Sequence, residues 1–466
     1  MSALEQIIPQ GYRQAEVGIV PEDWSTKPLV DLVNVIDGDR GHNYPSANDF
    51  HADGHCVFLS ATNVTKNGFS FREASFITKE KDTLLRKGKL KRNDIVLTTR
   101  GSVGQYAFYD DSVIYEHLRI NSGMVLIRLT SDDVKPDYLY NVLKSQIVNN
   151  QISTMSFGSA QPQLTVRGIN NFFVCYPSDT KEQTAIANAL SDVDALLTEL
   201  EKLIAKKQAI KTATMQQLLT GKTRLPQFAT FTEGSLEGKS QGQPKGTKPS
   251  ELGEIPEDWK VQTVDEQLKL LTDFEANGSF ESVAQNVSIK DNDGYAWYVR
   301  ATDLENSSRL SKVKYVDAKS YSFLKKTSLY GDELLITKRG EIGKVYFFEM
   351  KTEHATLAPN MYLLKLNENV CGKFLYYFFK SDIGQKLLKK NNASTSLGAL
   401  YKDDVKSMLI ALPSELEEQT AVSTIISDMD NEIQTLEQRL AKTRQIKQGM
   451  MQELLTGRTR LPYDKS

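Results

Sequence analysis

Residues 182–204 read EQTAIANALSDVDALLTELEKLI, and this stretch decides the fold of the chain. Its large apolar residues recur in alternating steps of four and three, which is the spacing of a coiled-coil seam. The same steps return 236 positions later, with different side chains, in EQTAVSTIISDMDNEIQTLEQRL at residues 418–440. The two seams consist of Ile186, Leu190, Val193, Leu197, Leu200 and Ile204, and of Val422, Ile426, Met429, Ile433, Leu436 and Leu440.

Each seam predicts a helix that is too long for one small domain. No proline or glycine occurs in residues 181–220, and Gly221 followed by Pro226 is a typical helix stop. A helix of this span is roughly 55 to 60 Å long, and its narrow apolar stripe needs a partner. The other seam can supply it. Chain order favours an antiparallel pair, because a parallel one would need the connector to span the whole helix, and a flexible chain of that size reaches roughly 30 Å.

The helices belong to a long internal repeat. The first copy opens with PEDW at residues 21–24 and the second with PEDW at 256–259, while LLTGKTRLP at 218–226 matches LLTGRTRLP at 454–462. A period this long exceeds that of solenoid repeats, so each copy is predicted to be a folded domain with a helical appendage. Two copies of one unit imply two equivalent sites.

The rest of each copy combines short strand-like runs, such as 56–59 and 333–337, with helical spacing at 138–148 and 374–388. We therefore predict an α+β fold with two pseudo-two-fold related mixed domains, separated by two long helices that pair as an antiparallel coiled coil. The predicted divisions are an N-terminal segment (1–24), a first domain (25–178), a central helix (179–226), a flexible linker with the second repeat opening (227–255), a second domain (256–414) and a C-terminal helix with its tail (415–466).

Composition is that of an ordinary globular protein. The 466 residues are 40% hydrophobic and 25% charged, with a net charge of -2 and a pI near 6.3. This balance does not indicate nucleic-acid binding by itself, although residues 86–100 form a local basic cluster. Three isolated cysteines argue against a disulfide framework, and the sequence shows neither a signal peptide nor a membrane span, so we expect a cytoplasmic protein.

Several fragments resemble catalytic or metal-binding motifs without completing them. Gly221-Lys222-Thr223 ends like a phosphate-binding loop but follows a helix and lacks the upstream glycine. His51, His55 and Cys56 lack the paired spacing of a zinc site and have no counterpart in the second copy. No proline follows another proline or an asparagine, so the methyltransferase motif Asn-Pro-Pro-Phe is missing. The sequence thus predicts no catalytic centre and no metal site.

Both copies share Arg-Gly-x-x-Gly after a strand, at Arg100 to Gly104 and at Arg339 to Gly343. The glycines are typical of a tight turn. A guanidinium at such a turn suits bidentate contact with a phosphate or with guanine, and the alternative is a structural ion pair.

The paired PEDW openings, the EQTA helix starts at Glu182 and Glu418 and the LLTG-x-TRLP endings resemble the specificity subunits of type I restriction-modification enzymes, over nearly the whole chain. The resemblance implies two target-recognition domains that each read one half of a split DNA sequence, held apart by two antiparallel helices. It also implies that this chain has no active site or cofactor of its own. Two methyltransferase subunits that bind S-adenosylmethionine and two motor-nuclease subunits that use ATP and Mg would complete the complex.

The base-reading residues are not implied by the resemblance, and we choose them as polar residues in expected loops that can make bidentate contacts. The choice is Asn63, Arg100, Arg119, Asn121, Gln161 and Gln163 in the first domain, and Lys338, Arg339, Asn360, Asn391, Asn392 and Ser394 in the second. A protein scaffold that does not read DNA is the rival hypothesis, and salt-dependent binding to a duplex distinguishes the two.

Overall fold

The computed structural model describes residues 8–155, 164–231, 241–305, 310, 312–390 and 399–463. The chain divides into two compact units: the first unit is Met1–Glu201 with Gln438–Ser466, and the second unit is Lys202–Glu437. Each unit contains one mixed domain and a part of both long helices, α5 (Thr180–Leu218) and α12 (Leu416–Leu454). In the described ranges, no helix is long and apolar enough to cross a membrane.

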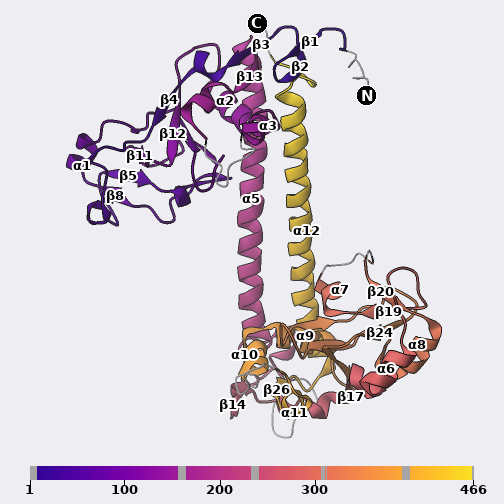
Figure 1. Ribbon diagram of the computed structural model, residues 1–466. Helices are drawn as coiled ribbons and strands as arrows, with labels where there is room; N and C mark the ends of the chain where they lie inside the picture. The colour runs from indigo at the N-terminus through magenta and orange to yellow at the C-terminus, as the bar shows by residue number, and fades with distance from the viewer. Residues whose placement is uncertain are drawn as a thin grey trace. The chain divides into compact units, whose positions relative to one another are not determined.

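The two long helices contain 39 residues each, as the seams predict, and they lie side by side (Figure 1). Ion pairs in the first unit give their direction, because Arg444 bonds Glu201 at 2.6 Å and Lys447 bonds Asp194 at 2.5 Å. The residue numbers rise along α12 while they fall along α5. The helices are therefore antiparallel, which confirms the prediction.

The second unit repeats this pairing. Lys207 bonds Glu432 at 2.7 Å, and Lys211 bonds Asp430, so residue numbers again run in opposite directions. None of the twelve seam residues is exposed: seven are buried, and Val193, Leu197, Met429, Leu436 and Leu440 are half-buried. The apolar stripe of each helix thus faces protein along its length.

Both long helices end at a glycine in the left-handed region, Gly221 with φ +70° and Gly457 with φ +69°. A side chain at either position would also collide with a neighbour, since an added Cβ would lie 2.4 Å from Pro256 or Pro21 respectively. These glycines are required by backbone conformation and by the close approach of the PEDW segments. The fragment at Gly221 is accordingly a helix stop, as expected.

The domain of the first unit is built on a four-stranded antiparallel sheet, and its β11 and β5 form a parallel pair in a second, smaller sheet. The large sheet has the order β10 (Tyr106–Phe108), β9 (Ile95–Thr98), β12 (Met124–Leu129) and β4 (Val33–Asp37). The small sheet has the order β11 (Leu118–Ile120), β5 (Cys56–Leu59) and β8 (Phe76–Ile77). The remaining elements are β1 (Tyr12–Ala15), β2 (Gly18–Pro21), β3 (Trp24–Pro28), β6 (Val64–Thr65), β7 (Gly68–Phe69), β13 (Phe173–Pro177), α1 (Lys79–Leu84), α2 (Pro136–Leu143), α3 (Gln146–Met155) and α4 (Val166–Asn170).

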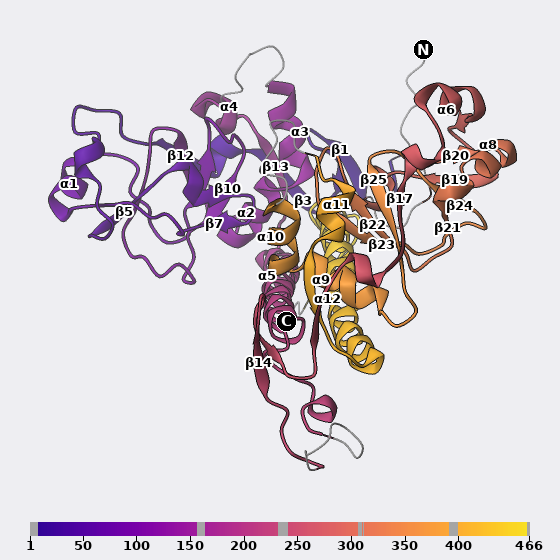
Figure 2. The ribbon, with the colours of Figure 1, turned by 90° about the horizontal axis from the view of Figure 1, so that it is seen from below.

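Alternation along the central strands gives this domain two cores. In β12, Val125 and Ile127 belong to the core shared with α2, α4 and α5, whereas Met124 and Leu126 belong to the core shared with the small sheet. Successive side chains of a strand point to opposite faces, so a sheet buried on both faces needs the continuous apolar run that this strand has. The small sheet and α1 consequently lie on the side of the large sheet away from α5 (Figure 2).

The large sheet of the second unit has the same topology, and the second sheet of this unit contains two additional strands, β18 and β21. Its large sheet has the order β17 (Leu268–Asp273), β25 (Met361–Leu366), β22 (Leu334–Thr337) and β23 (Val345–Phe347). Its second sheet has the order β18 (Ile289–Lys290), β20 (Lys314–Val316), β19 (Ala296–Val299), β24 (Ala355–Leu357) and β21 (Ser328–Leu329), with β19 and β24 parallel. The remaining elements are β14 (Thr247–Ser250), β15 (Gly253–Pro256), β16 (Lys260–Thr263), β26 (Leu409–Leu412), α6 (Phe280–Asn286), α7 (Ala301–Glu305), α8 (Ala318–Phe323), α9 (Gly372–Lys380), α10 (Asp382–Lys390) and α11 (Lys402–Lys406).

The three motifs of the repeat meet in space, but each meeting uses both copies. In the first unit, Arg460 of the second TRLP segment bonds Glu182 and Asp23 of the first copy. In the second unit, Arg224 of the first TRLP segment bonds Glu418 and Asp258 of the second copy. In each unit, the TRLP segment of one repeat therefore bonds the PEDW and EQTA motifs of the other repeat.

The connector at 227–255, predicted to be flexible, forms backbone hydrogen bonds in its described part. Phe231 is buried, its N–H donates to Gln243 at 3.0 Å, and its carbonyl accepts from Gly242 at 2.9 Å. The strands β14 and β15 then form a hairpin equivalent to β1 and β2. One aromatic side chain of this polar segment thus occupies a buried site. Residues 232–240 lie outside the described residues.

Candidate nucleic-acid interface

Three loops of the first unit meet at the end of β9. The backbone N–H groups of Thr99 and Arg100 donate to the carbonyl of Gly123, at 2.8 and 3.2 Å, and the N–H of Leu164 donates to the carbonyl of Thr99 at 3.2 Å. The loops after β9, before β12 and before α4 thereby form one cluster, which we call the first recognition loops (residues 99–105, 121–123 and 164–165). Segments about 20 and 60 residues apart in sequence come together there.

The turn that presents Arg100 is shaped by its backbone. Gly101 and Gly104 have φ values of +70° and +83°, and an added Cβ would meet no heavy atom within 4 Å at either position. The glycines are thus needed for conformation rather than for packing. Thr98 stabilises the turn, since its hydroxyl donates to the carbonyl of Ser102 at 2.5 Å and accepts from the N–H of Gln105 at 2.9 Å. Arg100 itself is exposed at the tip.

The second unit builds the same cluster from different residues. The N–H of Lys338 donates to the carbonyl of Asn360 at 2.9 Å, and the N–H of Leu400 donates to the carbonyl of Lys338 at 3.2 Å. Thr337 takes the place of Thr98, with its hydroxyl bonded to the carbonyl of Glu341 at 2.5 Å. We call residues 338–344, 358–360 and 399–401 the second recognition loops. Their Arg339 is exposed like its counterpart Arg100.

Five of the residues chosen from the sequence lie in these loops, and one of them, Lys338, has a buried side chain. Arg100, Arg339 and Asn360 are exposed, and Asn360 has a left-handed backbone with φ +73°. Asn121 is half-buried, and its side-chain oxygen accepts from the N–H of Gly123 at 2.8 Å. The loops therefore offer two arginines at equivalent places, together with two amides at non-equivalent ones, since Asn360 corresponds to Gly123. Arginine and asparagine side chains are both able to make bidentate contacts with base edges.

Asn63 has a structural position instead. It is 1% exposed, its side-chain oxygen accepts from the N–H of Ser60 at 2.8 Å, and its amide nitrogen donates to the carbonyls of Ser70 and Glu73 at 2.9 and 3.1 Å. These bonds use the groups that would read a base edge. The placement of Asn63 thus differs from the exposed loop position expected, because a polar residue that satisfies a buried turn has the same sequence signature as one that faces solvent.

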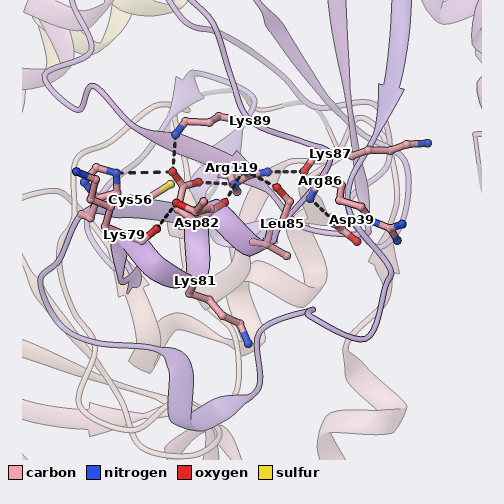
Figure 3. A network of polar contacts seen from close by, with 12 residues as sticks. Asp39, Cys56, Lys79, Lys81, Asp82, Leu85, Arg86, Lys87, Lys89 and Arg119 are labelled. Atoms are coloured by element: carbon pink, nitrogen blue, oxygen red, sulfur yellow. Dashed lines mark hydrogen bonds and ion pairs between the residues drawn. The ribbon is translucent and has the colours of Figure 1, made fainter.

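Arg119 is likewise buried, at 5% exposure, in strand β11. Its guanidinium bonds the carboxylate of Asp82 and donates to the carbonyls of Lys87 at 2.7 Å and Leu85 at 2.9 Å (Figure 3). Lys89 also bonds Asp82. Burial would raise the pKa of Asp82, but its hydrogen bonds with Lys89 and Arg119 outweigh this and hold the pKa below the ordinary 3.8. Arg119 therefore fixes the loop after α1 rather than facing DNA.

Lys338 occupies a comparable buried position in the second unit, although its backbone belongs to the recognition loops. It is 6% exposed, and its ammonium bonds Asp273 at 2.8 Å and also Glu275. Burial would raise the pKa of Asp273, but Lys338 and Lys402 outweigh burial and lower it. This ion network leaves Arg339, rather than Lys338, as the cation at the tip of the loop.

Gln161, Gln163, Asn391, Asn392 and Ser394 lie outside the described residues, although the segments that contain them lead directly into the recognition loops at Leu164 and Leu400. Burial raises the pKa of the Cys56 thiol to about 12, and the His55 ring is tilted against the His117 ring, with the ring centroids 4.2 Å apart. Over the described residues, no group of three His, Cys, Asp or Glu side chains could hold a metal ion.

Sequence reasoning did not select Arg40, which belongs to this interface. It is exposed in the loop after β4, and its guanidinium donates to the carbonyl of Ser122 in the first recognition loops at 3.3 Å. The backbone at Gly38 also packs there, since an added Cβ would lie 2.2 Å from the carbonyl oxygen of Asn121. The sequence signal was the DGDRG run at 37–41, whose glycines indicate a close approach of two backbones.

The duplicated fold, with a loop cluster in each unit, defines a protein with two equivalent recognition domains. The family model of the type I restriction modification DNA specificity domain matches the chain twice, at residues 21–212 and 256–445. The chain therefore belongs to this family of specificity domains and carries the domain in two copies.

Relatives of known name support the same assignment. The chain is 32% identical over 214 residues to the type I restriction enzyme MjaX specificity subunit of Methanocaldococcus jannaschii, an alignment that covers 45% of this chain and 48% of that protein. It is 22% identical over 188 residues to the EcoBI specificity subunit of Escherichia coli, covering 40% and 38%. The matched part thus spans about half the length, or less, of these relatives.

Solved structures share the fold at low sequence identity. The S subunit of a type I restriction-modification system from M. genitalium superposes with a TM-score of 0.55 at 15% identity, covering 92% of this chain and 96% of that one. A chain from a study of complex assembly and conformational transition of the type I R-M system gives 0.52 at 13% identity, covering 94% and 99%. The likeness thus extends over both units.

Proposed function

We propose that this chain is the DNA-specificity subunit of a type I restriction-modification complex, and that each unit reads one half of a bipartite target. The observation that carries this is the repeated loop cluster. Each unit presents an exposed arginine on an Arg-Gly-x-x-Gly turn, held by equivalent backbone bonds to the loop before β12 or β25. Arginine contacts guanine in the major groove through two parallel hydrogen bonds, and such a pair contributes about 1 to 3 kcal/mol of discrimination.

The two half-sites differ because the loops share a frame but not their contents. Ser102 of the first turn corresponds to Glu341 of the second, and both are exposed. A glutamate accepts a hydrogen bond from the amino group of cytosine, whereas a serine hydroxyl can donate or accept. Equivalent backbones with different side chains give the two units different base preferences.

The long helices would then act as a ruler and as a docking surface. Because α5 and α12 each contribute residues to both units, their length sets how far apart the half-sites lie. We assign the chemistry to partner subunits: two methyltransferase subunits with S-adenosylmethionine, and two motor-nuclease subunits with ATP and Mg. This chain would recognise DNA in the cytoplasm without catalysing a reaction itself.

Mapping methylated adenines in cells that express the chain with its methyltransferase partner tests the proposal. The expected result is one bipartite motif with two unlike halves and a fixed spacer. The purified chain should then bind a duplex with that motif in preference to one with either half scrambled, with an affinity that falls as salt rises. Binding that ignores both sequence and salt would favour the protein scaffold instead.

A further inference from the structure

A pair of adjacent basic residues follows a short helix beside the second sheet of each unit. In the first unit, Arg86 and Lys87 come two and three residues after α1, and in the second unit Lys325 and Lys326 come two and three residues after α8. All four residues are exposed. We call Arg86–Lys87 the first basic pair and Lys325–Lys326 the second basic pair.

The two pairs are structurally equivalent. Strand β8 pairs with β5 next to α1, as β20 pairs with β19 next to α8, and both helices have six residues. The residue after each helix, Leu85 or Leu324, is buried. The residues that follow each basic pair bond the parallel strand of the sheet, which is β11 in the first unit and β24 in the second. The N–H of Ile120 in β11 donates to the carbonyl of Gly88 at 2.9 Å, and Thr356 in β24 pairs with Ser328.

The backbone of the first basic pair is fixed from two sides. Asp39 accepts hydrogen bonds from the N–H of Gly41 at 2.8 Å and of Arg86 at 2.7 Å, and these bonds lower the pKa of Asp39 against the effect of burial. Arg119 bonds the carbonyl of Lys87 from below at 2.7 Å. The side chain of Lys87 extends away from Asp82, whereas the Arg86 side chain lies beside Asp39 and its charge helps to lower the pKa of that carboxyl (Figure 3).

The side chains of the first pair remain exposed to solvent. Within the described residues, neither Arg86 nor Lys87 forms an ion pair with a carboxylate. The nearby Asp39 is occupied by backbone N–H groups, and Asp37 lies 3.4 Å from Arg40. Arg40, Arg86 and Lys87 line one hollow of about 430 Å³ together with Asp37 and Asp39. Three cations against two carboxylates leave this surface with a small excess of positive charge.

The hollow adjoins the first recognition loops. Its Gly38 backbone packs on Asn121, and Arg40 bonds the carbonyl of Ser122. The segment after the first basic pair also packs closely on this loop, since an added Cβ at Gly88 would lie 3.3 Å from the Cα of Gly38. The first basic pair is therefore held at a fixed place beside the turn that presents Arg100.

The second basic pair is connected to its recognition loops by a different set of bonds. Lys326 donates from its ammonium to the carbonyl of Ala276 at 2.9 Å, and Asn277 donates to the hydroxyl of Thr327 at 2.8 Å. The segment at Asp273 that precedes them is bonded by Lys338 of the second recognition loops. The location and the charge of the pair are thus retained, although the supporting residues differ.

We propose that the two basic pairs are DNA-phosphate contacts that flank the base-reading loops, Arg86–Lys87 for one half-site and Lys325–Lys326 for the other. The proposal rests on the proposed function. The phosphate backbone is the same at both half-sites, whereas the bases differ. Residues that read bases should diverge between the units, as Ser102 and Glu341 do, and residues that contact phosphates should keep their charge.

The test compares the DNA binding of full-length variants. All of them are measured on one duplex that contains the bipartite motif found by methylation mapping. The variants are R86Q/K87Q in the first unit, K325Q/K326Q in the second, and K206Q/K442Q as the matched control, which removes two exposed charges from the long helices. Affinity is measured between about 50 and 200 mM salt. Each test variant should lower the slope of log K against log salt by about two and weaken binding about tenfold or more. The control should keep the wild-type slope.

The methylated motif gives the second readout. Both test variants should methylate the wild-type motif, because phosphate contacts carry no base information. An unchanged salt slope, an equal loss in the control, or a changed half-site would overturn the proposal. A wild-type chain that does not bind DNA in a salt-dependent way would instead overturn the proposed function, so the two failures are distinguishable. Thermal unfolding of each variant excludes misfolding as the cause of lost affinity.

Discussion

The guanidinium of Arg460 bonds the carboxylate of Glu182, 278 residues earlier in the chain, with Nη2 and Oε2 at 2.6 Å. Arg224 bonds Glu418 in the same way, at 2.7 Å. Since each arginine comes from the tail of the other repeat, neither sequence repeat corresponds to a structural unit. The PEDW and EQTA motifs of one copy form a socket, and the TRLP motif of the other copy fills it.

We expect Arg224→Ala to destabilise the protein more than Arg460→Ala. The Arg224 side chain is 10% exposed and Glu418 3%, whereas Arg460 is 36% exposed. Removing one partner of a buried ion pair costs about 3 to 5 kcal/mol, and solvent screening reduces the cost at the more exposed site. Urea unfolding of both variants measures the difference. Equal losses, or a larger loss for Arg460→Ala, would contradict the assignment.

Asp82→Asn should change how stability depends on pH. The folded state holds the pKa of Asp82 below its ordinary 3.8, so its contribution to stability is complete above about pH 4 and is lost as pH falls through the folded pKa. The variant should be less stable at pH 7, because Arg119 and Lys89 lose their counter-charge, and its stability should fall less steeply below pH 4. The exposed Asp111→Asn serves as the control and should follow the wild type. If the stability of the wild type and of Asp82→Asn fell equally steeply with pH below pH 4, the role of Asp82 would be disproved.

Arg100→Ala and Arg339→Ala should each alter one half of the recognised sequence. A lost bidentate contact with guanine costs about 1 to 3 kcal/mol and relaxes the preference at that base pair. The map of methylated adenines should therefore show degeneracy in one half for the first variant and in the other half for the second. Each variant is the control for the other. If both variants relaxed the same half, or neither changed the map, the arginines would not be base-reading residues.

Removing one heptad from each long helix should shorten the spacer between the half-sites. Deletion of residues 198–204 together with 437–443 keeps both seams in register and shortens each helix by about 10.5 Å, which corresponds to about three base pairs of DNA. Methylation should then occur at half-sites closer by that amount, with both halves unchanged. Deletion of four residues from each helix breaks the seams and should abolish methylation. A wild-type spacer in the heptad variant would show that the helices are not the ruler.

The secondary structure and the pairing of the long helices were predictable from the order of the residues alone. The helix predicted over the proline- and glycine-free residues 181–220 is α5 (Thr180–Leu218), and the strand-like run at 56–59 is β5 (Cys56–Leu59). Periodicity carries this information because a coiled-coil seam must repeat along its own helix, and a strand buried on both faces must be apolar throughout. The turn that exposes Arg100 was predictable for the same reason, since its glycines are local in sequence.

Which polar residues face solvent and which ones support the fold depends on contacts between distant parts of the chain. Arg119 in the sequence LRI resembles a residue of an ordinary strand, and its partner Asp82 is 37 residues away across a parallel strand pair. Asn63 fills a turn of its own, and Arg460 completes a socket built by the first repeat. Burial and long-range pairing depend on how strands and repeats meet, and local spacing along the chain does not encode that meeting.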